Sequence, residues 1–268
     1  MRPAFPVLRP RHTQMSPPEE PQPVEGPELA PTMSSAMSSI ARYHEYLWSY
    51  VEPWLGQRVM EIGVGFGQYT RRMLAERRRV LGCDLDATHL GELRGAVPSP
   101  LLETMRLDLE KPEQATASCA AFAPDTIVLL NVLEHIRLHG QALAFLREVA
   151  APGGRIVLIV PALSSLNNGL DREAGHHRRY SRASLARELT SAGWESVTTR
   201  YINLPGIPGW VVAGWLGRAG GKSTVLDAAS TNWLLRFYDR FFVGLSRLTD
   251  PVAARFAGLS IVAVAMKG

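Results

Sequence analysis

Two patterns of hydrophobic and polar positions alternate along this chain, and together they predict its fold class. Short, nearly continuous apolar runs predict buried strands at 58–62, 79–83, 101–107, 125–130, 154–160, 195–202 and 259–266. Apolar residues at helical spacing predict helices between these runs, near 67–77, 87–95, 112–120, 138–150 and 181–192. Buried strands interleaved with helices are typical of a parallel sheet covered on both faces. We therefore predict an α/β protein with a doubly wound, mostly parallel sheet.

Two segments depart from this rhythm and define the domain organisation. Residues 1–37 are rich in proline and have no apolar period, so we predict a disordered tail there. Residues 204–257 separate the last two predicted strands and include TNWLLRFYDRFFVGLSRL at 231–248, which predicts an amphipathic helix. We assign 38–268 to one domain, which contains 204–257 as a helical cap insertion. Its first helix is expected to have Ser38 or Ser39 as the N-cap and to end near Pro53.

Composition and charge narrow the classes of partner. The chain has 268 residues with 29 Lys and Arg against 25 Asp and Glu, and its basic residues are scattered. No basic stripe with interleaved aromatics is present, so we expect no nucleic-acid partner and predict a small-molecule substrate. The two cysteines cannot form a disulfide framework, and no apolar signal segment begins the chain, so we expect a cytoplasmic protein. The sequence leaves the oligomeric state open.

A glycine-rich stretch, VMEIGVGFGQYT at 59–70, follows the first predicted strand and opens a helix. Such a turn lets a ligand approach the main chain closely, as in sites for dinucleotides and for S-adenosylmethionine. The dinucleotide fingerprint spaces its glycines as G-x-G-x-x-G. Here Gly63, Gly65 and Gly67 give G-x-G-x-G, and Gln68 stands where the third glycine belongs. Glu61 would be unfavourable beside a pyrophosphate but suits a cationic ligand, which favours S-adenosylmethionine.

Two more acids end the second and third predicted strands. Asp84 can accept both hydroxyls of a ribose, and Asp108 can accept a hydrogen bond from an adenine amino group. Both fall at the carboxyl ends of strands, where open α/β sheets bind their ligands. A single aspartate there is often only a helix cap or a turn residue. The acids and glycines together favour a nucleoside site.

The series VMEIGVGFG, GCDLD, LDL, NVLEHI and APGGRIVLIVPA resembles the successive motifs of class I S-adenosylmethionine-dependent methyltransferases. The resemblance covers about Tyr43 to Gly193 and the final strand. It implies a Rossmann-like, seven-stranded sheet with an antiparallel last strand. It also implies S-adenosylmethionine as cofactor, bound by Glu61 at the methionine amino end, Gly63, Gly65 and Gly67 along its length, Asp84 and Leu85 at the ribose, Asp108 and Leu109 at the adenine, and Asn131 to Leu133 near the sulfonium.

A second stretch, DREAGHHRRYS at 171–181, resembles a D-x-x-x-G-H-x-R-R-Y-S stretch in a bacterial branch of these enzymes. Guanidinium groups bind carboxylate and phosphate through paired hydrogen bonds, so this stretch suits an anionic acceptor. We predict substrate contacts from His176, His177, Arg179 and Tyr180. In the alternative, Asp171, Glu173 and the arginines pair with one another and tie the loop to the sheet.

Methyl transfer is an in-line displacement that needs an aligned acceptor, and a hydroxyl acceptor also benefits from a general base. His135 is the candidate base, because it follows the fourth strand beside the expected sulfonium; in the alternative it only orients a loop. The pair Glu134 and His135 resembles the acid and histidine of ubiquinone-pathway O-methyltransferases, which can hold a divalent metal. Their pattern has a further acid where this chain has Asn131, so we predict no metal.

Together these features predict methylation of a small molecule of apolar or anionic character, at oxygen. The alternatives are a non-catalytic S-adenosylmethionine-binding partner protein and an NAD-dependent oxidoreductase. The aromatic residues of 204–257 suggest packing on the sheet, a cap over an apolar acceptor, or contact with a membrane surface through 231–248. Tyr43 and Tyr46 are expected either to close over the cofactor or to pack in the core.

Overall fold

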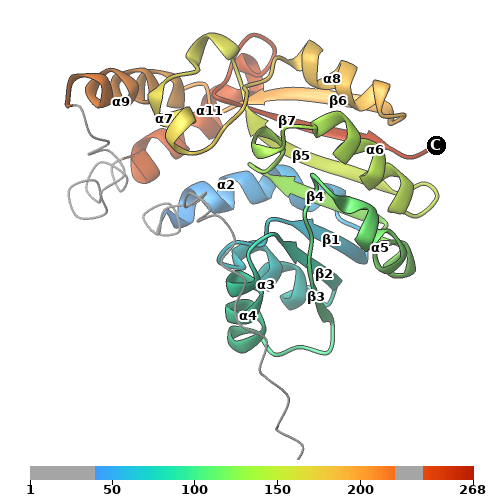
Figure 1. Ribbon diagram of the computed structural model, residues 1–268. Helices are drawn as coiled ribbons and strands as arrows, with labels where there is room; N and C mark the ends of the chain where they lie inside the picture. The colour runs from blue at the N-terminus through green and yellow to red at the C-terminus, as the bar shows by residue number, and fades with distance from the viewer. Residues whose placement is uncertain (1–39, 221–237) are drawn as a thin grey trace, which may run out of the picture.

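The computed structural model describes residues 40–220 and 238–268. It contains a seven-stranded sheet in the order β3-β2-β1-β4-β5-β7-β6, which runs from the bottom to the top of Figure 1. The strands are β1 (Arg58–Ile62), β2 (Arg79–Asp84), β3 (Leu102–Arg106), β4 (Thr126–Leu130), β5 (Arg155–Pro161), β6 (Glu195–Ile202) and β7 (Ser260–Met266). β1 to β5 pair in parallel, and β7 is antiparallel to both β5 and β6. The predicted fold class and the antiparallel last strand are confirmed.

Helices connect the strands at most of the predicted positions. They are α2 (Ala41–Val51), α3 (Gln68–Ala75), α4 (Ala87–Ala96), α5 (Thr116–Phe122), α6 (His139–Val149), α7 (Gly169–Glu173), α8 (Arg182–Ser191), α9 (Gly206–Gly220) and α11 (Val243–Ala253). Shorter turns are η1 (Glu52–Trp54), η2 (Pro112–Ala115), η3 (Leu133–His135), η4 (Ser164–Leu166) and the π-helical η5 (Tyr238–Phe242). The short helix α7 has no counterpart among the predicted elements. The predicted tail at 1–37 and residues 221–237 of the predicted insertion lie outside the described residues.

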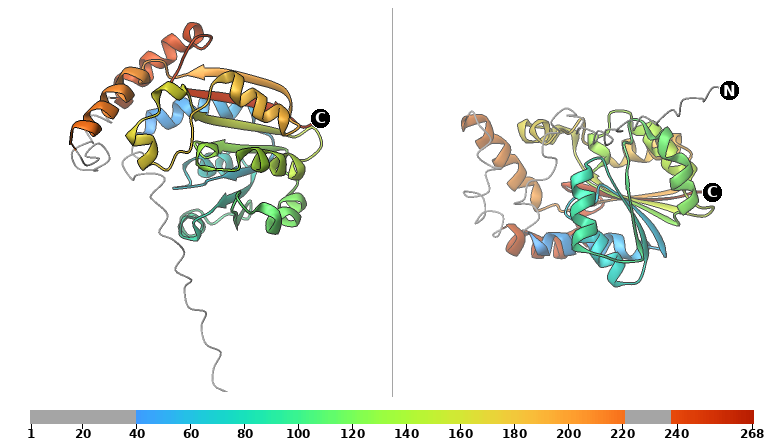
Figure 2. Two further views of the ribbon diagram at one scale, coloured as in Figure 1. Left: turned by 45° about the horizontal axis from the view of Figure 1, so that its top comes forward. Right: turned by 60° about the horizontal axis from the view of Figure 1, so that its bottom comes forward.

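The sheet separates two hydrophobic cores, because side chains alternate between its faces along each strand. On β5, Ile156 and Leu158 face one core, while Val157 and Ile159 face the other. Helices α5, α6 and α8 cover the first face, and α2, α3 and α11 cover the second. Figure 2 shows the sheet between these two helical layers. This arrangement leaves the carboxyl ends of the parallel strands as the edge at which a ligand site forms.

The start of α2 differs from the prediction. The helix begins at Ala41 with Ile40 in the N-cap position, whose side chain makes no capping hydrogen bond. The helix thus begins later than expected, and Ser38 and Ser39, the expected caps, lie outside the described residues. The carboxylate of Asp239 instead accepts hydrogen bonds from the backbone N–H groups of Tyr43, at 2.7 Å, and Arg42, at 3.3 Å. A residue of the 204–257 insertion thus supplies the negative charge that a helix N-terminus favours.

A second contact fastens α2 to the insertion. Asp250 on α11 is buried, and its carboxylate accepts hydrogen bonds from the hydroxyls of Tyr46 and, at 2.8 Å, Tyr50. The backbone N–H of Asn203 donates to the same carboxylate at 3.1 Å. Tyr46 is only 1% exposed, so of the two expectations for this residue the core position is the observed one. The insertion therefore holds α2 against the sheet.

Candidate functional site

The glycine turn lies directly after β1, and its backbone conformation explains why glycines occupy it. Gly63, Gly65 and Gly67 all have positive φ, at 76°, 48° and 71°, which side chains other than hydrogen disfavour. A Cβ on Gly63 would also lie 2.6 Å from the Val132 Cγ2 atom. The turn is held to the neighbouring strand because the Gly63 N–H donates to the Cys83 carbonyl at 2.8 Å. The result is a tight main-chain bend that opens directly into α3.

Glu61 lies near the end of β1 and points toward α3. Its side chain is 3% exposed and accepts a hydrogen bond from the Thr70 hydroxyl. Burial raises the pKa of Glu61 to about 8; the Thr70 hydrogen bond opposes the rise and the charge of Asp84 adds to it. A buried carboxylate with a raised pKa gains most from a cationic partner. This is the environment expected for an acid that meets the ammonium group of a ligand.

Asp84 at the end of β2 connects to the glycine turn. Its Oδ2 atom accepts a hydrogen bond from the Gly65 N–H at 3.0 Å, and its Oδ1 atom accepts one from the Asp86 N–H at 2.9 Å. His89 Nδ1 lies 3.5 Å from Oδ2. The carboxylate is therefore fixed in direction, and each oxygen retains a further lone pair for a ligand hydroxyl. Leu85 follows it and is half-buried.

The acids and loops after β3 and β4 complete this edge of the sheet. Asp108 accepts a hydrogen bond from the Glu110 N–H at 2.9 Å, and Leu109 beside it is buried. Asn131 is exposed, has φ of 55°, and donates its backbone N–H to the Ile159 carbonyl at 2.8 Å. Leu133 differs from its prediction, because its side chain is fully buried in the hydrophobic core. Val132, which approaches Gly63, is the apolar side chain of this loop that lies nearest the turn.

A second polar cluster forms where η3 meets the 171–181 loop. The ring centroids of His135 and His176 are 4.7 Å apart at an angle of 77°, and His176 Nε2 lies 3.9 Å from Glu134 Oε1. Burial raises the pKa of Glu134 to about 7, while nearby His176 opposes that rise. Burial also lowers the pKa of His135 to about 4; His176 adds to this shift, and a hydrogen bond with the Gly175 backbone opposes it. His135 is therefore a neutral imidazole at pH 7.

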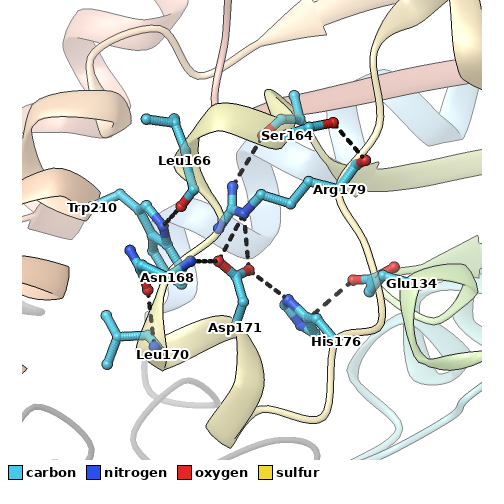
Figure 3. Close-up of polar contacts among 10 residues, drawn as sticks. Glu134, Ser164, Leu166, Asn168, Leu170, Asp171, His176, Arg179 and Trp210 are labelled. Atoms are coloured by element: carbon cyan, nitrogen blue, oxygen red, sulfur yellow. Dashed lines mark hydrogen bonds and ion pairs between the residues drawn. The ribbon is translucent and has the colours of Figure 1, made fainter.

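Asp171 organises the loop from inside (Figure 3). It is fully buried, and it lies 2.8 Å from His176 Nδ1 and 2.9 Å from Arg179 Nε. Burial alone would raise the pKa of Asp171, but the hydrogen bonds from His176 and Arg179 outweigh it and hold the pKa below its ordinary value. Arg179 also donates to the Ala162 carbonyl at 3.0 Å and stacks over the Trp210 ring at 4.5 Å.

These contacts correct two of the predicted substrate residues. Arg179 is 6% exposed and its guanidinium is occupied by Asp171 and Ala162, so it ties the loop to the sheet instead of reaching an acceptor. Tyr180 is 2% exposed, and its hydroxyl lies 3.0 Å from His139 Nδ1, so it belongs to the core. Of the pairing expected in the alternative, the Asp171–Arg179 pair is observed, while Arg178 donates to the Ile136 and Arg137 carbonyls. His176 faces Glu134 and His135, and His177 is exposed.

Asp171, Glu134 and Trp210 are not among the site residues that the sequence predicts. Asp171 contacts both His176, five residues later, and Arg179, eight residues later, whereas Trp210 contacts Arg179 from the distant helix α9. Glu134 was named only as half of an acid and histidine pair. The sequence did contain a signal for Asp171. An acid five residues before a histidine can reach from a short helix to the residues that follow the helix, and here α7 ends at Glu173.

Comparisons with known proteins identify the family of the chain. A family profile described as "Methyltransferase domain" matches residues 24–199, which is more than half of the chain, and the chain therefore belongs to this family. The match begins inside the segment predicted to be disordered. A probable S-adenosylmethionine-dependent methyltransferase of Mycolicibacterium smegmatis is 28% identical over 143 residues, 52% of this chain and 52% of the relative. The match thus spans about half the length of that curated relative.

Solved structures share the fold at low sequence identity. Phosphoethanolamine N-methyltransferase 2 of Haemonchus contortus, in complex with S-adenosyl-L-methionine, superposes with a TM-score of 0.56 at 14% identity, over 84% of this chain and 52% of that one. An S-adenosylmethionine-dependent methyltransferase from Archaeoglobus fulgidus has a TM-score of 0.55 at 16% identity, over 85% of this chain and 95% of that one. The [4+2]-cyclase SpnF has a TM-score of 0.53 at 16% identity, over 84% and 80%.

The chain therefore carries a methyltransferase domain, and its fold is shared with S-adenosylmethionine-dependent methyltransferases of known structure.

Proposed function

We propose that the protein transfers the methyl group of S-adenosylmethionine to a hydroxyl oxygen of a small-molecule acceptor of apolar or anionic character. The observation that carries this proposal is the buried Glu61 beside a glycine turn that is itself bonded to Asp84. The acid suits the cofactor's ammonium group, and Asp84 suits its ribose. In the reaction the S–CH₃ bond breaks as the O–CH₃ bond forms, S-adenosylhomocysteine leaves, and the hydroxyl proton passes to a base or to water.

His135 remains the proposed catalytic residue. Its neutral imidazole can accept a hydrogen bond from an acceptor hydroxyl and hold it in line. Its lowered pKa, about 4, makes it a weak proton acceptor, because a general base is most effective when its pKa lies near the working pH. We therefore propose that His135 mainly orients the acceptor. Of the predicted substrate residues, His176 and His177 remain candidates for contact with the acceptor.

Several finer points belong to the same proposal. We place the chain in the bacterial branch that carries the D-x-x-x-G-H-x-R-R-Y-S stretch, and we propose a cytoplasmic location, which suits the free thiols of Cys83 and Cys119. In the described residues, no helix combines the length and the apolar character needed to cross a membrane.

We also propose that α11 contacts an anionic membrane surface. Leu248, Val252 and Phe256 are 77%, 73% and 78% exposed, and they recur at helical spacing along α11 and the turn after it. Arg240, Arg247 and Arg255 are exposed close by in the sequence, whereas the acid of this helix, Asp250, is buried. An exposed apolar stripe with basic neighbours suits anionic lipid headgroups. Residues 231–237 of the predicted contact segment lie outside the described residues.

The second candidate is a protein that binds S-adenosylmethionine without transferring its methyl group. The likeness to the [4+2]-cyclase SpnF favours keeping it, since this fold also serves a reaction that its name does not describe as methyl transfer. The NAD-dependent alternative has no support in the family match. Calorimetry with NAD and S-adenosylhomocysteine side by side separates the two cofactors.

The test of turnover uses S-adenosylmethionine with a labelled methyl group and a small-molecule extract of the host. We expect labelled products with methyl ethers or methyl esters, identified by mass spectrometry. Label on nitrogen or carbon would reject the oxygen acceptor but keep the transferase. Tight binding of S-adenosylhomocysteine with no labelled product in any extract would favour the non-catalytic protein.

A further inference from the structure

Glu134 is a buried acid. Among the described residues, no group lies within hydrogen-bond distance of its carboxylate to neutralise the charge. Its residue is 0% exposed, and neither Oε1 nor Oε2 has a hydrogen-bond partner in the described part of the chain. An ionised carboxylate in such a place is strongly unfavourable unless it meets a cation or takes up a proton. Structural packing does not explain the residue, because an apolar side chain would fill the same space without this penalty.

His176 is turned toward this acid by a second carboxylate. Asp171 lies 2.8 Å from His176 Nδ1, which assigns the ring proton to that nitrogen and leaves Nε2 as a lone pair. Nε2 lies 3.9 Å from Glu134 Oε1. A histidine held by a carboxylate on one nitrogen and open on the other is the usual arrangement of a metal-ligating histidine. Asp171 is itself fixed by Arg179 and by the Asn168 N–H at 3.0 Å, so the ring direction is set in advance.

His135 supplies a third donor on the same side. One ligand atom each from Glu134, His135 and His176 lie within 4.8 Å of one another. A tetrahedral ion with bonds of about 2.1 Å needs donors about 3.4 Å apart. Side-chain shifts of about 1 Å would close the group around an ion. Glu134 is buried, whereas His135 and His176 are both partly exposed, so the group meets solvent on the side of the two histidines.

We propose that Glu134, His135 and His176 form a binding site for a divalent transition-metal ion such as Zn²⁺. Two imidazoles and one carboxylate match the donor set of catalytic zinc sites, in which a fourth position stays open for water or substrate. The site lies in the loop after β4, beside Asn131, where the resemblance places the reacting sulfonium. With an ion bound, the free lone pair of His135 would be on the metal, so His135 would hold the acceptor oxygen through the ion, and that oxygen would lose its proton more readily. Only this last role rests on the proposed function; ion binding does not.

The experiment titrates the purified full chain, stripped with a chelator, with Co²⁺ and then with Zn²⁺. We expect one Co²⁺ per chain, visible absorption of a four- or five-coordinate ion, and its displacement by Zn²⁺. Glu134→Gln and His176→Ala should each weaken Zn²⁺ binding at least 100-fold, and Asp171→Asn should weaken it about 10- to 100-fold through loss of ring orientation. His177→Ala is the matched control from the same stretch, and its affinity should equal that of the parent.

Absence of Co²⁺ absorption and of Zn²⁺ binding in the parent chain would overturn the proposal, as would equal binding by Glu134→Gln and His176→Ala. Circular dichroism checks that each variant folds. If Asp171→Asn does not fold, the titration of the parent chain still tests whether the metal site exists. Neither cofactor nor acceptor is present in this titration. Ion binding without methyl transfer would therefore reject the proposed function alone, and methyl transfer without ion binding would reject the metal site alone.

Discussion

The backbone N–H of Gly65 donates a 3.0 Å hydrogen bond to Oδ2 of Asp84. This bond joins the glycine turn after β1 to the acid at the end of β2, so the two elements expected to hold the cofactor act as one unit. The direction of the carboxylate is fixed before a ligand arrives, which reduces the side-chain ordering that binding would otherwise require.

Asp84→Ala should weaken the binding of S-adenosylhomocysteine by about 1–3 kcal/mol, because the ribose hydroxyls lose a charged acceptor. Isothermal titration calorimetry measures the change. Asp86→Ala is the matched control, since Asp86 caps α4 by accepting a hydrogen bond from the Thr88 N–H at 2.7 Å. It should lower the free energy of unfolding by about 1 kcal/mol and leave affinity unchanged. Unchanged affinity in Asp84→Ala would mean that the ribose lies elsewhere.

Gly63→Ala should reduce both stability and cofactor affinity. The positive φ of 76° disfavours alanine by about 1–2 kcal/mol, and its Cβ would press on the Val132 side chain at 2.6 Å. Gly91→Ala in α4 is the control, because a Cβ there meets nothing within 4 Å. Alanine in a helix interior should raise the free energy of unfolding by up to about 1 kcal/mol. Urea unfolding measures the free energy of unfolding of both variants. Equal changes in Gly63→Ala and Gly91→Ala would contradict the prediction.

Glu61 makes the stability of the cofactor-free protein depend on pH. Its pKa rises from an ordinary 4.5 to about 8 on folding, so the folded state retains a proton that the unfolded state releases. Its stabilising contribution is therefore complete below the ordinary pKa and is lost as pH rises to about 8.

Glu61→Gln removes this dependence. The variant should gain stability relative to the parent between about pH 5 and about pH 8.5, by a few kcal/mol at most, since one pKa unit corresponds to about 1.4 kcal/mol. Urea unfolding at both pH values gives the difference in free energy of unfolding between parent and variant. Other titrating groups contribute equally to both proteins and cancel. A parent-to-variant difference that stays constant across this range would show that Glu61 is ionised in the folded protein.

The exposed stripe on α11 predicts binding to anionic vesicles. The parent chain should sediment with vesicles that contain phosphatidylserine and not with purely zwitterionic ones, and salt should weaken the interaction. Leu248→Glu should reduce the bound fraction about tenfold, since it places a charge among the lipid-facing side chains. Leu138→Glu, at a leucine that is 40% exposed on the loop before α6, is the control. Equal loss in both variants, or no sedimentation of the parent, would reject the membrane contact.

Much of the sheet was predictable because its central strands β1, β2, β4, β5 and β7 are short, nearly continuous apolar runs, whereas the edge strands β3 and β6 carry more polar residues. The run at 154–160 became β5 at Arg155–Pro161, and the match elsewhere is similar. The start of α2 was not predictable, because its cap comes from Asp239, almost 200 residues later. A cap supplied from the distant insertion leaves no local signal, whereas a cap such as Ser181 before α8 does.

The site divides in the same way. Glu61, Gly63 and Asp84 lie at the strand ends and the turn where the sequence predicts them, because position along a strand follows from the apolar pattern. The roles of the residues in the 171–181 loop were harder to predict from sequence, since several of these residues can pair with the same acid. Arg179 is occupied by the buried Asp171, and only the folded chain shows that this pair, not an acceptor, satisfies the guanidinium. Leu133 was assigned to the pocket by its place in a motif, but it fills the core.

The most direct test of the account is a crystal structure of the full chain soaked with S-adenosylhomocysteine. We predict density along the carboxyl edge of the sheet, with the ligand's amino group beside Glu61, its ribose hydroxyls on Asp84, and its adenine near Asp108. Density at any other place, or a crystal that excludes the ligand at saturating concentration, would contradict it.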